Sequence, residues 1–245
     1  MLTKNRINAI AELTQQYWAR EVQKDYFSKL ASGKEIGHRI ADLVDDKTAA
    51  TLTAEYLVKY EHDEKDRRKV RSMGDVWVEE DKIYYPINIK TGIVGQEGQP
   101  NLVSIKKLMM SLLEYRIDSY YLLMVKFDLP KLDSGAVNPP RGVSCKTYMV
   151  DMLDYLDCVT FDAGPGQTML KAKKFFSSQA GNASIDKQPL QHKIKTLLAL
   201  LEDGQERLIK NRRDSLKIYQ NKVQDYLQSK RLCVTVEAQK VLNLK

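Results

Sequence analysis

The residues of this chain best suited to chemistry are a carboxylate, an amide and an amine that follow one another closely: Asp75, Asn88 and Lys90. Asp75 lies in a strand-like run over residues 70–78, and the other two lie in a second such run over residues 82–92. Side chains alternate along a strand, so Asn88 and Lys90 are expected on the same face. If the two runs pair as a hairpin, Asp75 reaches the same place. An acid, an oxygen ligand and an ammonium group at one point make a minimal metal-assisted hydrolysis site.

Each of the three residues also has an ordinary structural interpretation. Asp75 would be a turn residue near a glycine, Asn88 a surface amide and Lys90 an exposed strand lysine. Their combination is more specific, because Asp is depleted in strands and the Asn-x-Lys pair interrupts an otherwise apolar run. The spacing alone is a degenerate pattern, and the flanking sequence is therefore needed to interpret it.

The flanking sequence resembles that of the PD-(D/E)xK nucleases and, within them, the HincII-type restriction endonucleases. The resemblance covers about 35 residues and is carried by residues 74–76, 87–91 and 99–108. It implies an α/β fold, with a mixed central sheet flanked by helices. It also implies that Asp75 and Asn88 are metal ligands, that the Ile89 carbonyl is a further metal oxygen and that Lys90 is the catalytic lysine. The cofactor implied is Mg²⁺, which prefers oxygen ligands and lowers the pKa of a bound water.

The chain departs from this family at Asn88, where Asp or Glu is the commonest residue. The loss of one negative charge weakens Mg²⁺ binding. Three explanations stay open: an amide that occurs naturally in some of these nucleases, an engineered Asp-to-Asn change that traps an uncleaved complex, or a natural inactive relative. An upstream acid often joins such sites, and Glu55 and Glu61 are candidates, although solvated helix acids are the commoner interpretation.

Two segments are suited to reading DNA. The loop over residues 96–101 is rich in amides and glycines, and amide side chains can form paired hydrogen bonds with adenine. The turn over residues 164–174 presents an amide followed by lysines, which suit base edges and phosphates respectively. An ordinary flexible loop and a surface hairpin are the alternatives. The candidate DNA-binding residues are Gln96, Gln99, Asn101, Gln167 and Lys171.

Composition restricts the class of protein. The chain has 245 residues and a formal net charge of +7, which favours a polyanionic partner such as nucleic acid. We see neither a secretory signal nor an apolar run of the roughly 20 residues that span a bilayer. The three cysteines are too scattered for a disulfide framework, which fits a reducing cytoplasm. The three histidines share no metal-ligand spacing.

We expect one nuclease domain over residues 1–245. It comprises a helical N-terminal and dimerisation part (1–60), a catalytic α/β core (70–175) and C-terminal helices (190–230). Periodicity predicts helices over residues 4–30, 35–43, 48–60, 104–116 and 190–230, the last with a break near Gly204. Strands are also predicted over residues 120–127, 143–150 and 158–161.

The expected function is that of a Mg²⁺-dependent type II restriction endonuclease that cleaves double-stranded DNA as a homodimer. A two-fold symmetric protein matches a short palindromic site most economically. The alternatives are a structure-specific repair or junction endonuclease, and a catalytically inactive DNA-binding relative.

Overall fold

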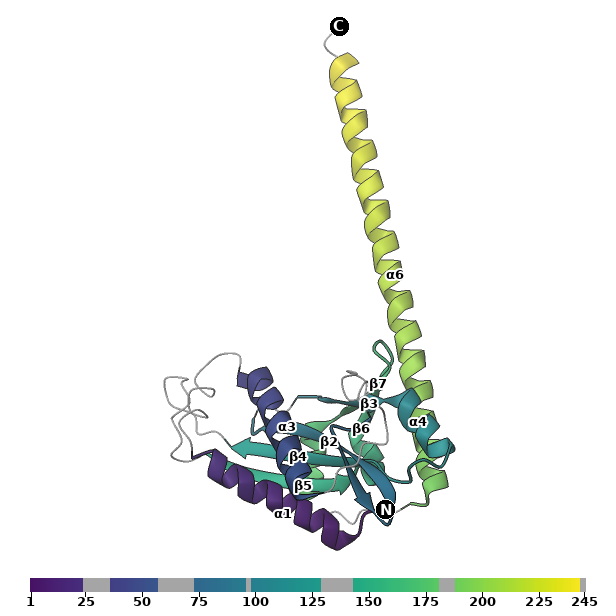
Figure 1. Cartoon of the computed structure of the whole chain (residues 1–245). Coiled ribbons are helices and arrows are strands. Elements are labelled where there is room, and N and C mark those ends of the chain that lie inside the picture. The colour runs from purple at the N-terminus through teal and green to yellow at the C-terminus, as the bar shows by residue number, and fades with distance from the viewer. Residues whose placement is uncertain (24–35, 57–72, 96–97, 129–142, 181–187, 243–245) are drawn as a thin grey trace. The chain divides into compact units, whose positions relative to one another are not determined.

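The computed structural model describes residues 1–23, 36–56, 73–95, 98–128, 143–180 and 188–242 (Figure 1). Contacts within the chain divide it into two compact units, Met1–Leu201 and Glu202–Lys245. The first unit contains two β-sheets with their helices, and the described part of the second unit is helical. Among the described helices, none is both long enough and apolar enough to cross a bilayer.

The larger sheet has the strand order β1-β2-β4-β5 and mixed pairing. Its strands are β1 (Val76–Glu80), β2 (Ile83–Ile93), β4 (Tyr121–Asp128) and β5 (Ser144–Asp151). The pairs β1–β2 and β4–β5 are antiparallel, whereas β2 and β4 are parallel. A parallel pair needs a crossover, and here the crossover contains helix α4 (Ile105–Leu113). The α/β class with a mixed sheet is confirmed.

The β1–β2 hairpin that the site requires is present. Its turn consists of Asp81 and Lys82, whose φ angles of 52° and 64° are those of a two-residue hairpin turn with the twist of its strands. This turn sets the register and places Val76 opposite Ile87. Asp75 therefore directly precedes β1 instead of lying inside a strand.

The two faces of the larger sheet pack against different elements. Helices α1 (Lys4–Glu21) and α3 (Ile36–Glu55) cover one face, as Figure 1 shows. Ile87 and Ile89 of β2 are buried there in one apolar cluster with Ile10 and Leu52 of the two helices. The other face packs against α4, the 3₁₀ segment η1 (Met152–Cys158), helix α5 (Ala172–Ala180) and the first turns of helix α6 (Leu190–Leu242). Asn88 and Lys90 belong to this second face, as the alternation of β2 predicts.

A smaller antiparallel sheet lies on the second face. It has the order β3-β7-β6, with β3 (Asn101–Ser104), β7 (Gln167–Leu170) and β6 (Val159–Asp162). The sequence pattern did not predict β3 or its pairing with β7, because four residues are too few to establish an alternation. The strands predicted over residues 120–127, 143–150 and 158–161 are confirmed to within one residue.

Three helix predictions need correction. The two helices predicted over residues 35–43 and 48–60 are the single helix α3, whose buried Val44, Thr48 and Leu52 form one continuous face. Helix α4 ends at Leu113 because Tyr115 adopts a left-handed φ of 56°. The predicted break near Gly204 is wrong, since α6 continues through it to Leu242. A glycine inside a helix costs only about 1 kcal/mol, so it does not by itself end one.

The first predicted helix begins at Lys4 as expected and ends at Glu21. The rest of its predicted range lies partly outside the described residues.

Candidate functional site

The structure brings the carboxylate of Asp75 and the amine of Lys90 together at the edge of β2. The backbone N–H of Asp75 donates to the Ile87 carbonyl at 2.9 Å, and its Oδ2 accepts from the Ile89 N–H at 2.7 Å. The same Oδ2 lies 4.0 Å from Lys90 Nζ. The Asp75 side chain is 38% exposed and that of Lys90 is 19% exposed, so both are accessible from solvent.

Gly74 allows this arrangement because the backbone passes very close to β2. A Cβ at position 74 would lie 3.0 Å from both N and O of Ile87, and 3.1 Å from the Cβ of Pro86. Two of these contacts are with backbone atoms of a central strand, which has little room to move. The absence of a side chain at position 74 therefore lets the chain enter β1 with Asp75 against β2.

Asn88 lies on the same strand face as Lys90 but is far more deeply buried, with 4% exposure. Its Nδ2 donates to the Leu102 carbonyl of β3 at 2.9 Å. That carbonyl can only accept, which fixes the amide nitrogen on that side and turns Oδ1 away. Among the described residues Oδ1 has no hydrogen-bond partner. A buried amide oxygen without a partner is costly, and its presence in a native core needs an explanation.

The backbone of Ile89 contributes to the same edge. In a strand, the N–H and C=O of one residue point to the same neighbour. Since the Ile89 N–H donates to the Asp75 carboxylate, the Ile89 carbonyl faces the edge along which Asp75 lies.

These groups fit a hard divalent cation. The Asp75 carboxylate, the unpartnered Asn88 Oδ1 and the Ile89 carbonyl are all oxygen donors, and Mg²⁺ is commonly held by one or two carboxylates with waters completing the shell. In the part of the chain that is described, no three His, Cys, Asp or Glu side chains form a metal-binding group. The set here has a single carboxylate, so its charge is lower than that of a two-carboxylate site.

Tyr120 is a site residue that the sequence did not indicate. It is 1% exposed, and its hydroxyl has no hydrogen-bond partner of good geometry among the described residues. Burial raises the pKa of Tyr120, the negative charge of Asp75 raises it further, and the nearby Asn88 amide opposes the shift. The strand register agrees with a position next to Asn88: Asn88 pairs with Leu122, and Tyr120 lies two residues before Leu122 on the same buried face. A tyrosine at the start of an apolar strand is so common that its sequence position carries no signal.

Two of the candidate DNA-binding residues, Asn101 and Gln167, lie in the smaller sheet. Pairing of β3 with β7 places Asn101 opposite Met169, two residues from Gln167, and Pro100 accepts a hydrogen bond from Leu170 at 3.0 Å. Gln99 and Asn101 are exposed, whereas Gln167 and Lys171 are half-buried. Gln96 lies outside the described residues. Pro100 and Asn101 are thus joined to β7, and the next residue, Leu102, is hydrogen-bonded to Asn88.

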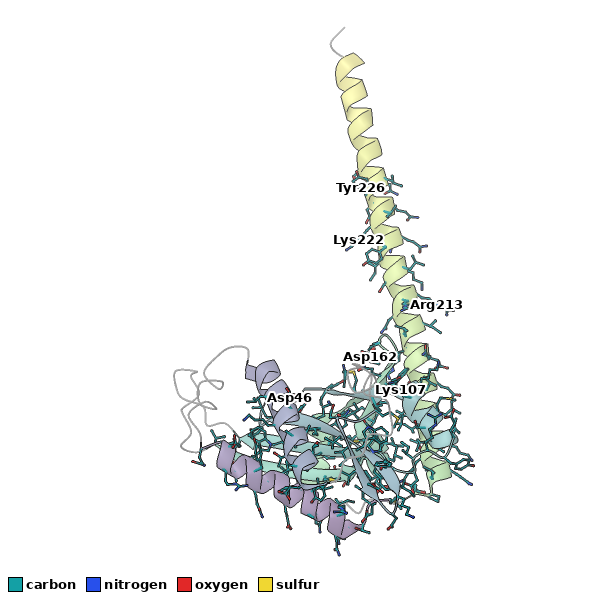
Figure 2. The ribbon with its side chains drawn as sticks, in the orientation of Figure 1. Asp46, Lys107, Asp162, Arg213, Lys222 and Tyr226 are labelled. Atoms are coloured by element: carbon teal, nitrogen blue, oxygen red, sulfur yellow. The ribbon has the colours of Figure 1, made fainter. Side chains whose placement is uncertain are left out.

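The structure describes one of the two upstream acidic candidates. Glu55 is exposed at the end of α3, and Glu61 lies outside the described residues. The second unit carries exposed basic side chains along α6, among them Arg213 and Lys222, together with the exposed Tyr226 (Figure 2).

No protein-family model and no curated protein matches this chain.

Proposed function

We propose that this protein is a Mg²⁺-dependent, sequence-specific endonuclease that hydrolyses phosphodiester bonds of double-stranded DNA, a type II restriction enzyme with a PD-(D/E)xK core. One observation carries the proposal: the Asp75 carboxylate is fixed on the backbone of Ile89 and lies 4.0 Å from the Lys90 ammonium. Asn88, two residues before Lys90, supplies an amide oxygen with no partner among the described residues.

In this proposal each residue has a distinct task. Asp75, Asn88 and the Ile89 carbonyl hold Mg²⁺, which when bound supplies positive charge to the phosphodiester. Lys90 places its ammonium beside the scissile phosphate and offsets the negative charge that grows in the pentacovalent transition state. The Asp75 carboxylate keeps Lys90 near the reacting group, and the Lys90 ammonium orients the attacking water.

Specificity is assigned to the small sheet. Gln99 and Asn101 are exposed beside β7, which carries Gln167 and leads to Lys171. Amides of this kind read base edges in a groove, while lysines contact phosphates. The net charge of +7 supports a polyanionic substrate. We place the activity in the cytoplasm, where the buried Cys145 and Cys158 stay reduced.

We further propose that the active form is a homodimer on a palindromic site, and that α6 contributes to the contact. Ile209, Leu216 and Val223 are spaced seven residues apart, and Tyr219 and Tyr226 follow the last two after three residues. All five side chains are 48–65% exposed. This is the spacing of a coiled-coil seam, whose apolar stripe is normally covered by another helix.

The N-terminal helices offer less apolar surface for a dimer. The apolar faces of α1 and α3 pack on the larger sheet through Ile10 and Leu52. A dimer surface within residues 1–60 stays a prediction.

Incubation of the purified protein with plasmid DNA and Mg²⁺, followed by mapping of the ends, tests this function. We expect fragments with fixed ends at one short palindrome, and no cleavage when Mg²⁺ is chelated. Cleavage of branched DNA regardless of base sequence would instead identify a structure-specific nuclease. Duplex binding without any nicking, even after Asn88→Asp, would identify an inactive DNA-binding relative.

A further inference from the structure

The buried side of the proposed site contains two polar atoms without partners. Asn88 Oδ1 and the Tyr120 hydroxyl both lack a hydrogen bond among the described residues, and both side chains are at least nine-tenths buried. Pairing of β2 with β4 places Asn88 beside Leu122, and Tyr120 lies two residues before Leu122 on the same buried face, so Asn88 and Tyr120 are neighbours there. Two unsatisfied groups in one place destabilise a fold unless something else uses them.

The backbone of Tyr120 is fixed by two hydrogen bonds. Its N–H donates to Asp151 Oδ1 at 3.2 Å, and its carbonyl accepts from the Met152 N–H at 2.7 Å. Asp151 in turn lies 3.7 Å from the Lys193 ammonium of α6, which also pairs with Asp154. These contacts fix the backbone from which the buried Tyr120 side chain extends.

Asn88 is held at only one end of its amide. Its Nδ2 is bound to the Leu102 carbonyl, while nothing described holds Oδ1. An amide ligand is effective only if its oxygen is aimed, and a neighbouring hydroxyl is a typical group that aims it.

We propose that Tyr120 is a positioning residue of the metal site, whose hydroxyl orients the Asn88 amide so that Oδ1 serves the cation held by Asp75. This inference rests on the proposed function, because it assigns a role toward the same cation. It also gives a reason for an amide at position 88: an oriented, neutral oxygen is tolerated in a buried position where a second carboxylate would be costly.

The test compares two adjacent tyrosines. Tyr120→Phe removes the hydroxyl beside Asn88. Tyr121→Phe removes a hydroxyl on the opposite face, which accepts from the Leu2 N–H at 2.7 Å. Mg²⁺ binding to the full chain, without DNA, is measured by calorimetry, and thermal unfolding is measured on the same samples.

We expect Tyr120→Phe to weaken Mg²⁺ binding by about tenfold or more, the usual effect of losing an outer-shell partner, with no drop in the unfolding midpoint. Tyr121→Phe should lower the unfolding midpoint, because the buried Leu2 N–H loses its hydrogen-bond acceptor. It should leave Mg²⁺ binding unchanged.

Equal Mg²⁺ affinity in wild type and Tyr120→Phe would overturn the inference while leaving the proposed function intact. An equal loss of affinity in both tyrosine variants would overturn it as well, since the effect would then be general. If the wild type binds no Mg²⁺, or if Asp75→Ala binds Mg²⁺ as well as the wild type does, the proposed function and the inference fail together.

Discussion

The carboxylate of Asp75 accepts a hydrogen bond from the backbone N–H of Ile89 at 2.7 Å. The acid is thus located by the main chain of β2 and does not depend on another side chain for its position. The Lys90 ammonium, at 4.0 Å from the same oxygen, is the weaker contact. Removal of Lys90 should therefore leave Asp75 in place, which makes the lysine a clean target for mutation.

Lys90→Ala should abolish DNA cleavage while leaving specific DNA binding within a few-fold of wild type. The reason is that the ammonium acts on charge that develops only in the transition state. Plasmid nicking and a gel-shift titration measure the two effects. Lys4→Ala, an exposed lysine on α1, is the control and should change neither. A large loss of binding in Lys90→Ala would show that the lysine supports the fold or the DNA contact.

Asn88→Asp should increase or create cleavage and should make stability depend on pH and Mg²⁺. Without metal, a carboxyl at this buried position must keep its proton to donate to Leu102, so its folded-state pKa rises above that of the unfolded chain. The free energy of unfolding then falls as pH increases, and Mg²⁺ should restore it. Thermal unfolding at acidic and alkaline pH, with and without Mg²⁺, measures this.

The matched control is the exposed Asn101→Asp, which should show no such pH or metal effect on stability. If the unfolding midpoint of Asn88→Asp depends on neither pH nor Mg²⁺, position 88 does not contact a cation.

Replacement of Gln99 or Asn101 by Ala should cost about 1–3 kcal/mol of binding on the cognate site and much less on unrelated duplexes. Both side chains are exposed, Asn101 pairs with Met169 of β7, and the proposed function assigns both residues to base edges. Binding to cognate and scrambled duplexes at one salt concentration gives the comparison. Equal losses on every sequence would reassign these residues to phosphate contact or to folding.

Leu216→Glu should convert the proposed homodimer to a monomer, because it places a charge in the middle of the α6 stripe. Ile218→Glu is a stringent control: Ile218 is 55% exposed on the same helix, but about 200° around the axis from Leu216. Sedimentation velocity of the two variants separates the outcomes. A dimer that survives Leu216→Glu would move the contact to another surface.

Asp151 should lower the free energy of unfolding as pH rises from about 4 to about 6. Burial raises the pKa of Asp151 to about 6, against the lowering effect of the Lys193 ammonium. The folded state therefore binds this proton more tightly than the unfolded chain, whose Asp has a pKa of about 3.9, and the difference costs up to about 3 kcal/mol once pH exceeds 6. Urea unfolding of wild type and Asp151→Asn across this range isolates the effect. Parallel curves for the two proteins would contradict it.

Much of the fold is predictable from local pattern. The apolar run after Tyr120 and the alternation along β2 are strong signals, because burial on one or both faces dictates them. The β3–β7 pairing and the continuity of α6 through Gly204 were not predictable in this way. The β3–β7 pairing depends on contact between two segments that are distant in the sequence. The continuity of α6 depends on the rest of this long helix offsetting the small free-energy cost of one glycine.

The site was predictable in part for the same reason. Strand alternation fixes the shared face of Asn88 and Lys90, and the hairpin brings Asp75 to them. How deeply Asn88 is buried depends on Leu102 of β3, and the role of Tyr120 depends on where β4 starts in space. Neither has a signature in the residues around position 88.

The close passage of Gly74 over Ile87 has a broader implication. The position of Asp75 is fixed partly by a neighbouring residue that has no functional group of its own. Even a single added methyl there would force the strand pair apart by a few tenths of an ångström or shift the acid beside it. Loss of the proposed activity can thus arise from a substitution at a residue with no functional group, one that a search confined to acids, amides and amines would pass over.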